Sequence, residues 1–165
     1  MYRWLTFVML FFLAPASAAT PPRTTYYFVM AKHSEKCLHI EGASKENDAP
    51  ITQWTCIGQP NVQFDRMDLR RGGFILKARH SDKCVQVRGA SKDNDARITQ
   101  WDCLVQDNVQ WSLRPTGEPA YFFIVNKNSG KCLHVRGASN ENGALITQWA
   151  CVEQPNLKWT FMPAP

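Results

Sequence analysis

The chain has 165 residues, of which 44% are hydrophobic and 20% are charged, and its formal net charge is +5 at pH 7. This length suits one domain or two small ones, and the composition is that of a soluble globular protein rather than of a disordered chain or a membrane bundle. The basic residues are scattered, apart from Arg70 and Arg71. The chain therefore lacks the basic stripe expected of a nucleic-acid-binding protein.

The start of the chain has the pattern of a secretory signal peptide. Arg3 supplies a positive charge, residues 5–13 form a short apolar run, and Ala16-Ser17-Ala18 offers a cleavage site. A membrane-spanning helix needs ~20 apolar residues, and this run is about half that length. We therefore expect residues 1–19 to be a signal peptide and residues 20–165 to be one secreted domain without membrane insertion. The domain would be periplasmic if the source is bacterial.

The rest of the chain consists of three copies of one sequence repeat. Residues 33–56, 80–103 and 128–151 align without a gap. A polar tail follows each copy and a short apolar segment precedes it, so the repeats cover about residues 26–70, 71–117 and 118–163. A fixed period of this length indicates a repeat architecture in which the units share one core.

Each unit contains four short apolar segments that are typical of β-strands. In the second copy they cover residues 74–78, 84–88, 98–102 and 111–113. Turn residues separate them, and one pair in each copy occupies a place where a positive φ is expected: Asn47-Asp48, Asn94-Asp95 and Asn142-Gly143. Three copies are too few for a propeller. The sequence therefore predicts an all-β protein, a β-trefoil of three pseudo-symmetric four-stranded repeats whose barrel closes without free edges.

The six cysteines agree with this repeat, because each unit holds two at the same spacing. Equivalent units should form equivalent bonds within themselves, so we expect three disulfides: Cys37–Cys56, Cys84–Cys103 and Cys132–Cys151. Close Cys or His pairs of the kind that bind zinc are missing from the sequence. Asp48 and Asp95 could suggest a calcium site, but the equivalent residue of the third repeat is Gly143, which has no carboxylate. A calcium role is therefore disfavoured. We expect no metal and no cofactor.

The repeated residues resemble those of the ricin B-type lectins. The shared pattern is a Lys-Cys-Leu strand, a Gly-Ala-Ser turn, an Ile-Thr-Gln-Trp-x-Cys strand and an Asn-x-x-Trp closing segment. In that family each unit can form a shallow sugar pocket. An aromatic residue two before the second cysteine stacks on the sugar, an Asp two after the first cysteine accepts hydrogen bonds from hydroxyl groups, and an Asn in the closing segment adds polar contacts.

The resemblance therefore implies nine carbohydrate-binding residues, three in each repeat. The stacking positions are Trp54, Trp101 and Trp149, and the amide positions are Asn61, Asn108 and Asn156. The family's Asp is replaced by His39, Gln86 and His134, which still offer donors and acceptors. Because of this replacement, galactose-type and xylan-type glycans both remain possible ligands. Because histidine titrates near pH 6.5, we expect binding by the first and third repeats to change between pH 5 and 7.

Strand alternation predicts which of these side chains face outward. Ile51, Ile98 and Ile146 lie three residues before the stacking tryptophans, so an isoleucine in the core places its tryptophan on the opposite face. We expect Phe64, Trp111 and Trp159 to line the barrel. Two alternatives stay open: the stacking tryptophans could belong to the core, and the asparagines could cap turns.

The charged turns favour binding over catalysis. Glu46, Asp93 and Glu141 recur in polar turns, whereas a glycosidase needs two carboxylates on either side of one bond in a pocket. Hydrolase and phosphate-loop motifs are missing from the sequence. The sequence thus predicts a monomeric secreted lectin that is not an enzyme. A protein-binding targeting subunit for a toxin or secreted enzyme, and a protease inhibitor using residues 115–119, are the alternatives.

Overall fold

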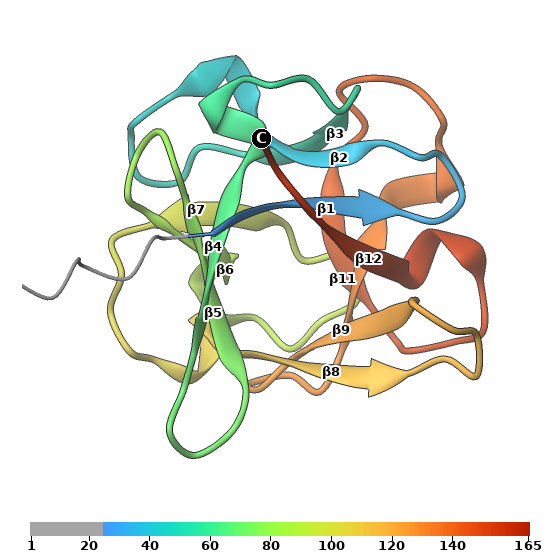
Figure 1. Ribbon diagram of the computed structural model, residues 1–165. Helices are drawn as coiled ribbons and strands as arrows, with labels where there is room; N and C mark the ends of the chain where they lie inside the picture. Colours follow the sequence, from blue (N-terminus) through green and yellow to red (C-terminus); the bar gives the residue numbers. More distant parts are fainter. Residues whose placement is uncertain (1–24) are drawn as a thin grey trace, which may run out of the picture.

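The computed structural model describes residues 25–165, and they form twelve β-strands joined by turns and six short 3-10 helices (Figure 1). The predicted signal peptide lies outside the described residues. Among residues 25–165, no helix has the length and apolar character needed to cross a membrane.

Each repeat supplies four strands, as the sequence predicts. The first repeat forms β1 (Tyr26–Ala31), β2 (Cys37–Ile40), β3 (Ile51–Trp54) and β4 (Phe64–Asp68). The second forms β5 (Phe74–Ala78), β6 (Cys84–Val87), β7 (Ile98–Trp101) and β8 (Trp111–Pro115). The third forms β9 (Phe122–Asn126), β10 (Cys132–Val135), β11 (Ile146–Trp149) and β12 (Lys158–Pro163).

Six of the strands close into a barrel. Antiparallel pairing runs from β1 to β4, β5, β8, β9 and β12, and then returns from β12 to β1. The other six form the hairpins β2–β3, β6–β7 and β10–β11. Three isolated bridges join one hairpin to the next: Pro50 with Thr99, Thr52 with Leu145, and Arg97 with Thr147. The predicted β-trefoil is confirmed, and closure of the barrel leaves its six strands without a free edge.

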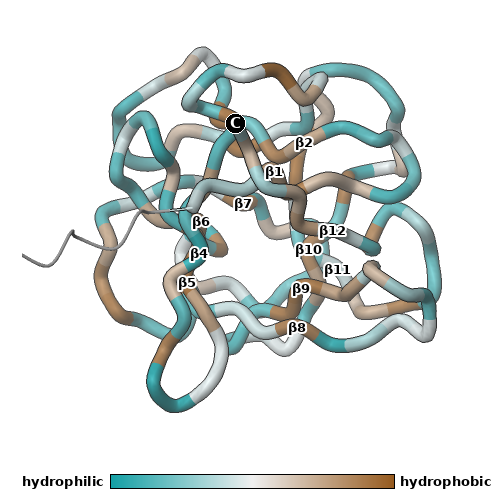
Figure 2. Tube along the Cα trace, in the orientation of Figure 1, coloured by the Kyte–Doolittle hydropathy of each residue, from teal (hydrophilic) through white to brown (hydrophobic). Residues whose placement is uncertain are grey.

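The barrel core is built from equivalent positions of the three repeats. Phe64, Trp111 and Trp159 are at most 1% exposed, as the sequence predicts. The indole Nε1 of Trp111 donates to the carbonyl of Val85 at 3.1 Å, and that of Trp159 donates to the carbonyl of Leu133 at 3.0 Å. Burial therefore leaves neither indole N–H unpaired. Figure 2 shows that the connections on the outside of the molecule are mostly hydrophilic.

One disulfide cross-links each repeat, and the pairing is the one that the sequence predicts. Cys37–Cys56, Cys84–Cys103 and Cys132–Cys151 are each separated by 19 residues and have Cα atoms 5.0–5.2 Å apart. Each bond joins the start of the second strand of its repeat to the segment just after the third. In the chain-entropy account, a loop of this size stabilises the folded state by about 3 kcal/mol.

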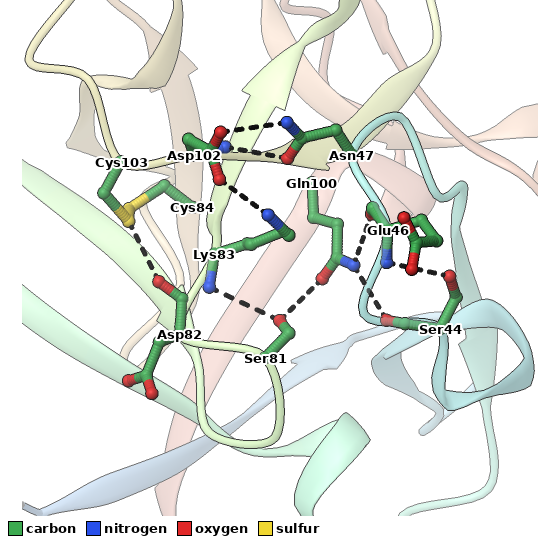
Figure 3. A network of polar contacts seen from close by, with 10 residues as sticks. All are labelled: Ser44, Glu46, Asn47, Ser81, Asp82, Lys83, Cys84, Gln100, Asp102 and Cys103. Atoms are coloured by element: carbon green, nitrogen blue, oxygen red, sulfur yellow. Dashed lines mark hydrogen bonds and ion pairs between the residues drawn. A yellow bond between two sulfur atoms is a disulfide. The ribbon is translucent and has the colours of Figure 1, made fainter.

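A buried glutamine links each repeat to the one before it. Gln100 is fully buried, and its Nε2 donates to the carbonyls of Ser44 and Glu46, both at 2.8 Å (Figure 3). Its Oε1 accepts from the hydroxyl of Ser81 at 2.8 Å. The side chain thus fastens a turn of the first repeat to the second repeat. We call this arrangement the glutamine clamp.

The clamp recurs around the whole molecule. Gln148 of the third repeat donates to the carbonyls of Ser91 and Asp93 in the second, at 3.0 and 2.9 Å. Gln53 of the first repeat donates to the carbonyls at positions 139 and 141 in the third, at 2.7 and 2.9 Å. The three clamps therefore form a closed cycle in which every repeat is held by the next.

The turns held by the clamps carry the predicted positive φ, although only at the second residue of each pair. Asp48, Asp95 and Gly143 have φ values of 68°, 65° and 84°. The asparagine before each of them uses its side chain instead. Asn47 accepts a hydrogen bond from the backbone N–H of Asp102 at 3.1 Å, next to Trp101. The equivalent contacts of Asn94 and Asn142 hold the residues that follow Trp149 and Trp54.

The glutamine clamp generates a stability prediction. Gln100→Ala removes three hydrogen bonds made by a fully buried side chain, so it should lower the free energy of unfolding by about 3 kcal/mol. Urea denaturation measures this change. Gln106→Ala is the matched control, because Gln106 is exposed and its loss should change stability by less than about 0.5 kcal/mol. Equal stability of the two variants would show that the clamp does not hold the repeats together.

Candidate functional site

Three tryptophans lie at the surface at equivalent places. Trp54, Trp101 and Trp149 end strands β3, β7 and β11, and their exposed fractions are 37%, 38% and 37%. The isoleucine three residues earlier is at most 1% exposed in each strand, as strand alternation predicts. The alternative in which these indoles are sealed in the core is wrong.

Each exposed indole lines a pocket of about 400–470 Å³. We name the pockets by repeat. Pocket 1 contains His39, Trp54 and Asn61. Pocket 2 contains Gln86, Trp101 and Asn108, and pocket 3 contains His134, Trp149 and Asn156. The structure thus brings the nine predicted residues together in three groups, one in each repeat.

A histidine lies beside the indole in pockets 1 and 3. In pocket 1 the ring of His39 stacks against Trp54, with ring centroids 5.2 Å apart and planes 28° apart. Its Nδ1 shares a 2.9 Å hydrogen bond with the hydroxyl of Thr52. In pocket 3 His134 has the same partners, with a 2.9 Å contact to Thr147 and a 5.6 Å centroid distance to Trp149. The threonine bond fixes the orientation of each ring beside the pocket.

Gln86 of pocket 2 has its polar atoms bonded within the protein. Its Oε1 accepts from Nδ2 of Asn108 at 2.9 Å, and its Nε2 donates to the hydroxyl of Thr99 at 3.3 Å. The side chain is 7% exposed. Pocket 2 therefore presents a neutral amide that is already engaged, where pockets 1 and 3 present an imidazole.

Burial keeps the two pocket histidines neutral at pH 7. Desolvation lowers the pKa of His39, and the nearby His80 lowers it further. Desolvation also lowers the pKa of His134, while the carboxylate of Asp95 acts in the opposite direction. Both pKa values lie below the ordinary 6.5, so each ring offers one donor and one acceptor nitrogen at neutral pH.

The three asparagines tie the closing segment to the hairpin. Asn61, Asn108 and Asn156 are only 4–5% exposed. The Nδ2 of each donates to a backbone carbonyl at the end of the second strand, at 3.0–3.1 Å: Ile40, Val87 and Val135. This bond is structural, but it joins two distant segments and does not cap a turn. It also orients the side chain, so that the amide oxygen is the end left to face the pocket.

The structure adds charged residues that the sequence analysis did not assign to the sites. Pocket 2 also contains Arg88 and Asp48, which form an ion pair of 2.6 Å between Nη2 and Oδ2. Pocket 3 contains Arg136 and Asp95, paired at 2.8 Å. In both, the aspartate comes from the preceding repeat. Pocket 1 has Glu41 and Gly143 at these places.

The remaining acidic turn residues behave as the sequence predicts. Glu46, Asp93 and Glu141 are exposed in three separate turns. Within residues 25–165, His, Cys, Asp and Glu side chains do not gather in groups of three or more that could hold a metal ion.

Comparison with known proteins identifies a family match over most of the chain. A family model described as the ricin-type beta-trefoil lectin domain matches residues 25–159. The designed three-fold symmetric protein ThreeFoil is similar in structure, with a TM-score of 0.81 and 36% sequence identity, over 83% of this chain and 97% of that protein.

Two natural proteins share the similarity over part of their length. The exo-beta-1,3-galactanase 1,3Gal43A of Clostridium thermocellum has a TM-score of 0.82 and 29% identity, over 86% of this chain and 31% of that enzyme. The clotting factor G alpha subunit of Tachypleus tridentatus is 43% identical over 54 residues, which are 30% of this chain. The chain spans 8% of the length of that subunit.

The pocket histidines generate a pH prediction. An NMR titration should give midpoints below pH 6.5 for His39 and His134. The unfolded chain takes up these protons near pH 6.5 and the folded protein only at lower pH, so stability present above pH 6.5 is lost as the pH falls. The double variant His39→Gln/His134→Gln copies the second repeat, and it should lose less stability than the wild type between pH 7 and 5. Equal losses in both proteins would refute this account.

Proposed function

The chain belongs to the ricin-type β-trefoil lectin family, and on this premise we propose that it is a secreted carbohydrate-binding protein with one shallow glycan pocket in each repeat. The observation that carries the proposal is the exposed indole that recurs at the same place in all three repeats. In each pocket, polar side chains surround this indole.

The chemistry of each pocket suits a sugar ring. One face of a sugar carries C–H groups and is apolar, so it can stack on an indole, which contributes a large rigid surface. The ring hydroxyls need donors and acceptors at its edge. In pockets 1 and 3 the Nδ1 of the neutral imidazole is engaged by threonine, so Nε2 supplies one donor or acceptor. In every pocket the amide oxygen of the buried asparagine adds an acceptor.

A single shallow pocket of this kind binds weakly. Three pockets on one rigid body raise the effective concentration of the second and third sites once the first is occupied. The avidity proposed here therefore depends on a surface that displays many copies of a glycan. We propose that the protein acts as a monomer against such a surface. Galactose-type glycans are the first candidates, since one similar structure is a galactanase, and xylan-type glycans are the second.

Two features support export. The three disulfides require an oxidising compartment to form and persist, and residues 1–19 have the pattern of a signal peptide.

The linker between the second and third repeats counts against a protease inhibitor. An inhibitory loop must stand free of the body to enter a protease cleft. Instead, Glu118 forms ion pairs with Lys158 at 2.7 Å and with Lys32. Thr116 accepts a hydrogen bond from the N–H of Glu118 at 3.2 Å, within the linker itself. The two ion pairs hold Glu118 against the start of β12 and the residue that follows β1.

The proposal predicts the effect of removing the three indoles. The triple variant Trp54→Ala/Trp101→Ala/Trp149→Ala should lose detectable binding on a glycan array, because stacking is removed from every pocket. Circular dichroism should show an intact fold, since the disulfides and the buried barrel residues remain. Met67→Ala is the matched control, because Met67 is 43% exposed but contributes to none of the three pockets.

Two outcomes would contradict the proposal. Normal binding by the triple variant would place the glycan site elsewhere on the protein. Absence of binding by the wild type on arrays of galactose- and xylose-containing glycans, together with capture of a partner that survives deglycosylation, would favour the protein-binding alternative.

A further inference from the structure

We propose that pockets 2 and 3 form one class of site, selective for neutral sugars that present two adjacent hydroxyl groups, whereas pocket 1 lacks this selectivity. The selectivity would come from Asp48 and Asp95, each supplied to the pocket by the preceding repeat. The inference rests on the proposed function and names the ligand chemistry of the same sites.

The aspartates reach their pockets across repeat boundaries. Asp48 belongs to the first repeat and contributes to pocket 2, where its Oδ2 lies 2.6 Å from Nη2 of Arg88. Asp95 belongs to the second repeat and contributes to pocket 3, where its Oδ2 lies 2.8 Å from Nη2 of Arg136. Each pocket therefore has a carboxylate and a guanidinium side by side, next to an exposed indole.

Pocket 1 lacks the guanidinium, and its carboxylate, that of Glu41, stands at the place of the arginine. The position equivalent to the aspartates is Gly143, which has no side chain, and the position equivalent to the arginines is Glu41. The acceptor and the donor that pockets 2 and 3 share are thus both replaced in pocket 1. A ligand that needs both of them would distinguish pocket 1 from the other two.

The two aspartates occupy turn positions with a positive φ. Asp48 and Asp95 have φ values of 68° and 65°, in the left-handed region, where Gly143 of the third repeat has 84°. Aspartate tolerates this region better than most residues with a Cβ, so the turn accepts a carboxylate at this position. The ion pairs do not explain the aspartates through stability, because half-exposed pairs contribute little.

The carboxylates also have spare acceptor capacity. In both aspartates, Oδ1 is buried and has no hydrogen-bond partner among the described residues. The buried Oδ1 is out of reach of a sugar, so the acceptor is Oδ2, which has a second lone pair for a hydroxyl while the first holds the arginine. The influence of Asp95 on the pKa of His134 agrees with a carboxylate that faces pocket 3. Desolvation and then His80 lower the pKa of His39, and no carboxylate opposes them.

This pair of groups fits adjacent hydroxyls. A carboxylate accepts a hydrogen bond from one hydroxyl, and the guanidinium beside it donates to the oxygen of the next. The carboxylate neutralises the arginine and repels an acidic sugar, so a neutral sugar is favoured. The second-strand aspartate that the family uses is replaced in this chain by His39, Gln86 and His134. The neighbouring repeat would supply the missing carboxylate to two of the three pockets.

The test isolates one pocket at a time. The double variant Trp54→Ala/Trp149→Ala leaves pocket 2 as the intact pocket. It is displayed on streptavidin tetramers, so that weak binding is detected, and applied to an array of neutral and uronic-acid-bearing glycans. Adding Asp48→Gly should weaken binding to the neutral glycans at least ~10-fold, because a hydrogen bond to a charged group is lost. The melting temperature should stay equal or rise, because glycine relieves the positive φ.

The chain offers a closely matched control. Asp82 also has a positive φ, of 56°, and also forms an ion pair, with Lys77 at 3.0 Å. Its third-repeat counterpart is Gly130, yet it contributes to none of the three pockets. Asp82→Gly in the same background should therefore leave glycan binding unchanged.

A transfer experiment tests the same idea in reverse. The double variant Trp101→Ala/Trp149→Ala leaves pocket 1 as the intact pocket. Adding Gly143→Asp and Glu41→Arg to this variant gives pocket 1 the aspartate–arginine pair of pockets 2 and 3. A Cβ at Gly143 meets nothing within 4 Å, and although a φ of 84° strains any side chain there, Asp48 and Asp95 hold similar φ values at the equivalent positions. The variant should gain at least ~10-fold in affinity for the neutral glycans that pocket 2 binds.

The outcomes separate this inference from the proposed function. If the wild type binds no glycan on the array, both fail. If Trp54→Ala/Trp149→Ala binds and Asp48→Gly changes its affinity by less than about twofold, the inference alone is overturned. Preference of pocket 2 for uronic-acid glycans would also overturn it. A parallel loss in Asp82→Gly would show that the effect comes from the backbone and not from the carboxylate.

Discussion

The glutamine clamp is the interaction on which the rest of the structure depends. Gln53, Gln100 and Gln148 are fully buried, and each satisfies two backbone carbonyls of a neighbouring turn. A fully buried amide without hydrogen-bond partners is costly, so the turn and the glutamine must form together. The three clamps close a cycle, and each repeat completes its structure only when its neighbours are present. We therefore expect one repeat not to fold alone.

The clamp also builds the pockets. The turn it holds carries an asparagine that fixes the residue after the neighbour's tryptophan, as Asn47 does for Asp102 (Figure 3). The next residue in that turn, Asp48, Asp95 or Gly143, then contributes to the neighbour's pocket. Every pocket is therefore assembled from two repeats. The exposed indoles lie at the end of strands that are rigidly paired, which suits a binding surface that does not rearrange.

The sequence predicted much of this, and the part it missed has a specific cause. Periodicity and alternation predicted the strands, the disulfides, the buried Trp111 and Trp159 and the outward Trp54, because these depend on contacts inside one repeat. The pairing of Arg88 with Asp48 crosses a repeat boundary. Within a single repeat the two positions do not match in charge, because the first repeat has Glu41 with Asp48 and the third has Arg136 with Gly143. The opposite charges match only when the arginine position of one repeat is compared with the aspartate position of the repeat before it. The Nδ2 contacts of the asparagines likewise need the folded hairpin.

The central claim is that sugars bind at the outward indoles, and the indole N–H signals of an NMR spectrum test it most directly. During titration with galactose- and xylose-containing oligosaccharides, the signals of Trp54, Trp101 and Trp149 should shift. Those of Trp111 and Trp159, which are hydrogen-bonded inside the barrel, should stay in place. Shifts confined to the barrel indoles, or no shift at the outward three while the protein binds glycans, would contradict the claim.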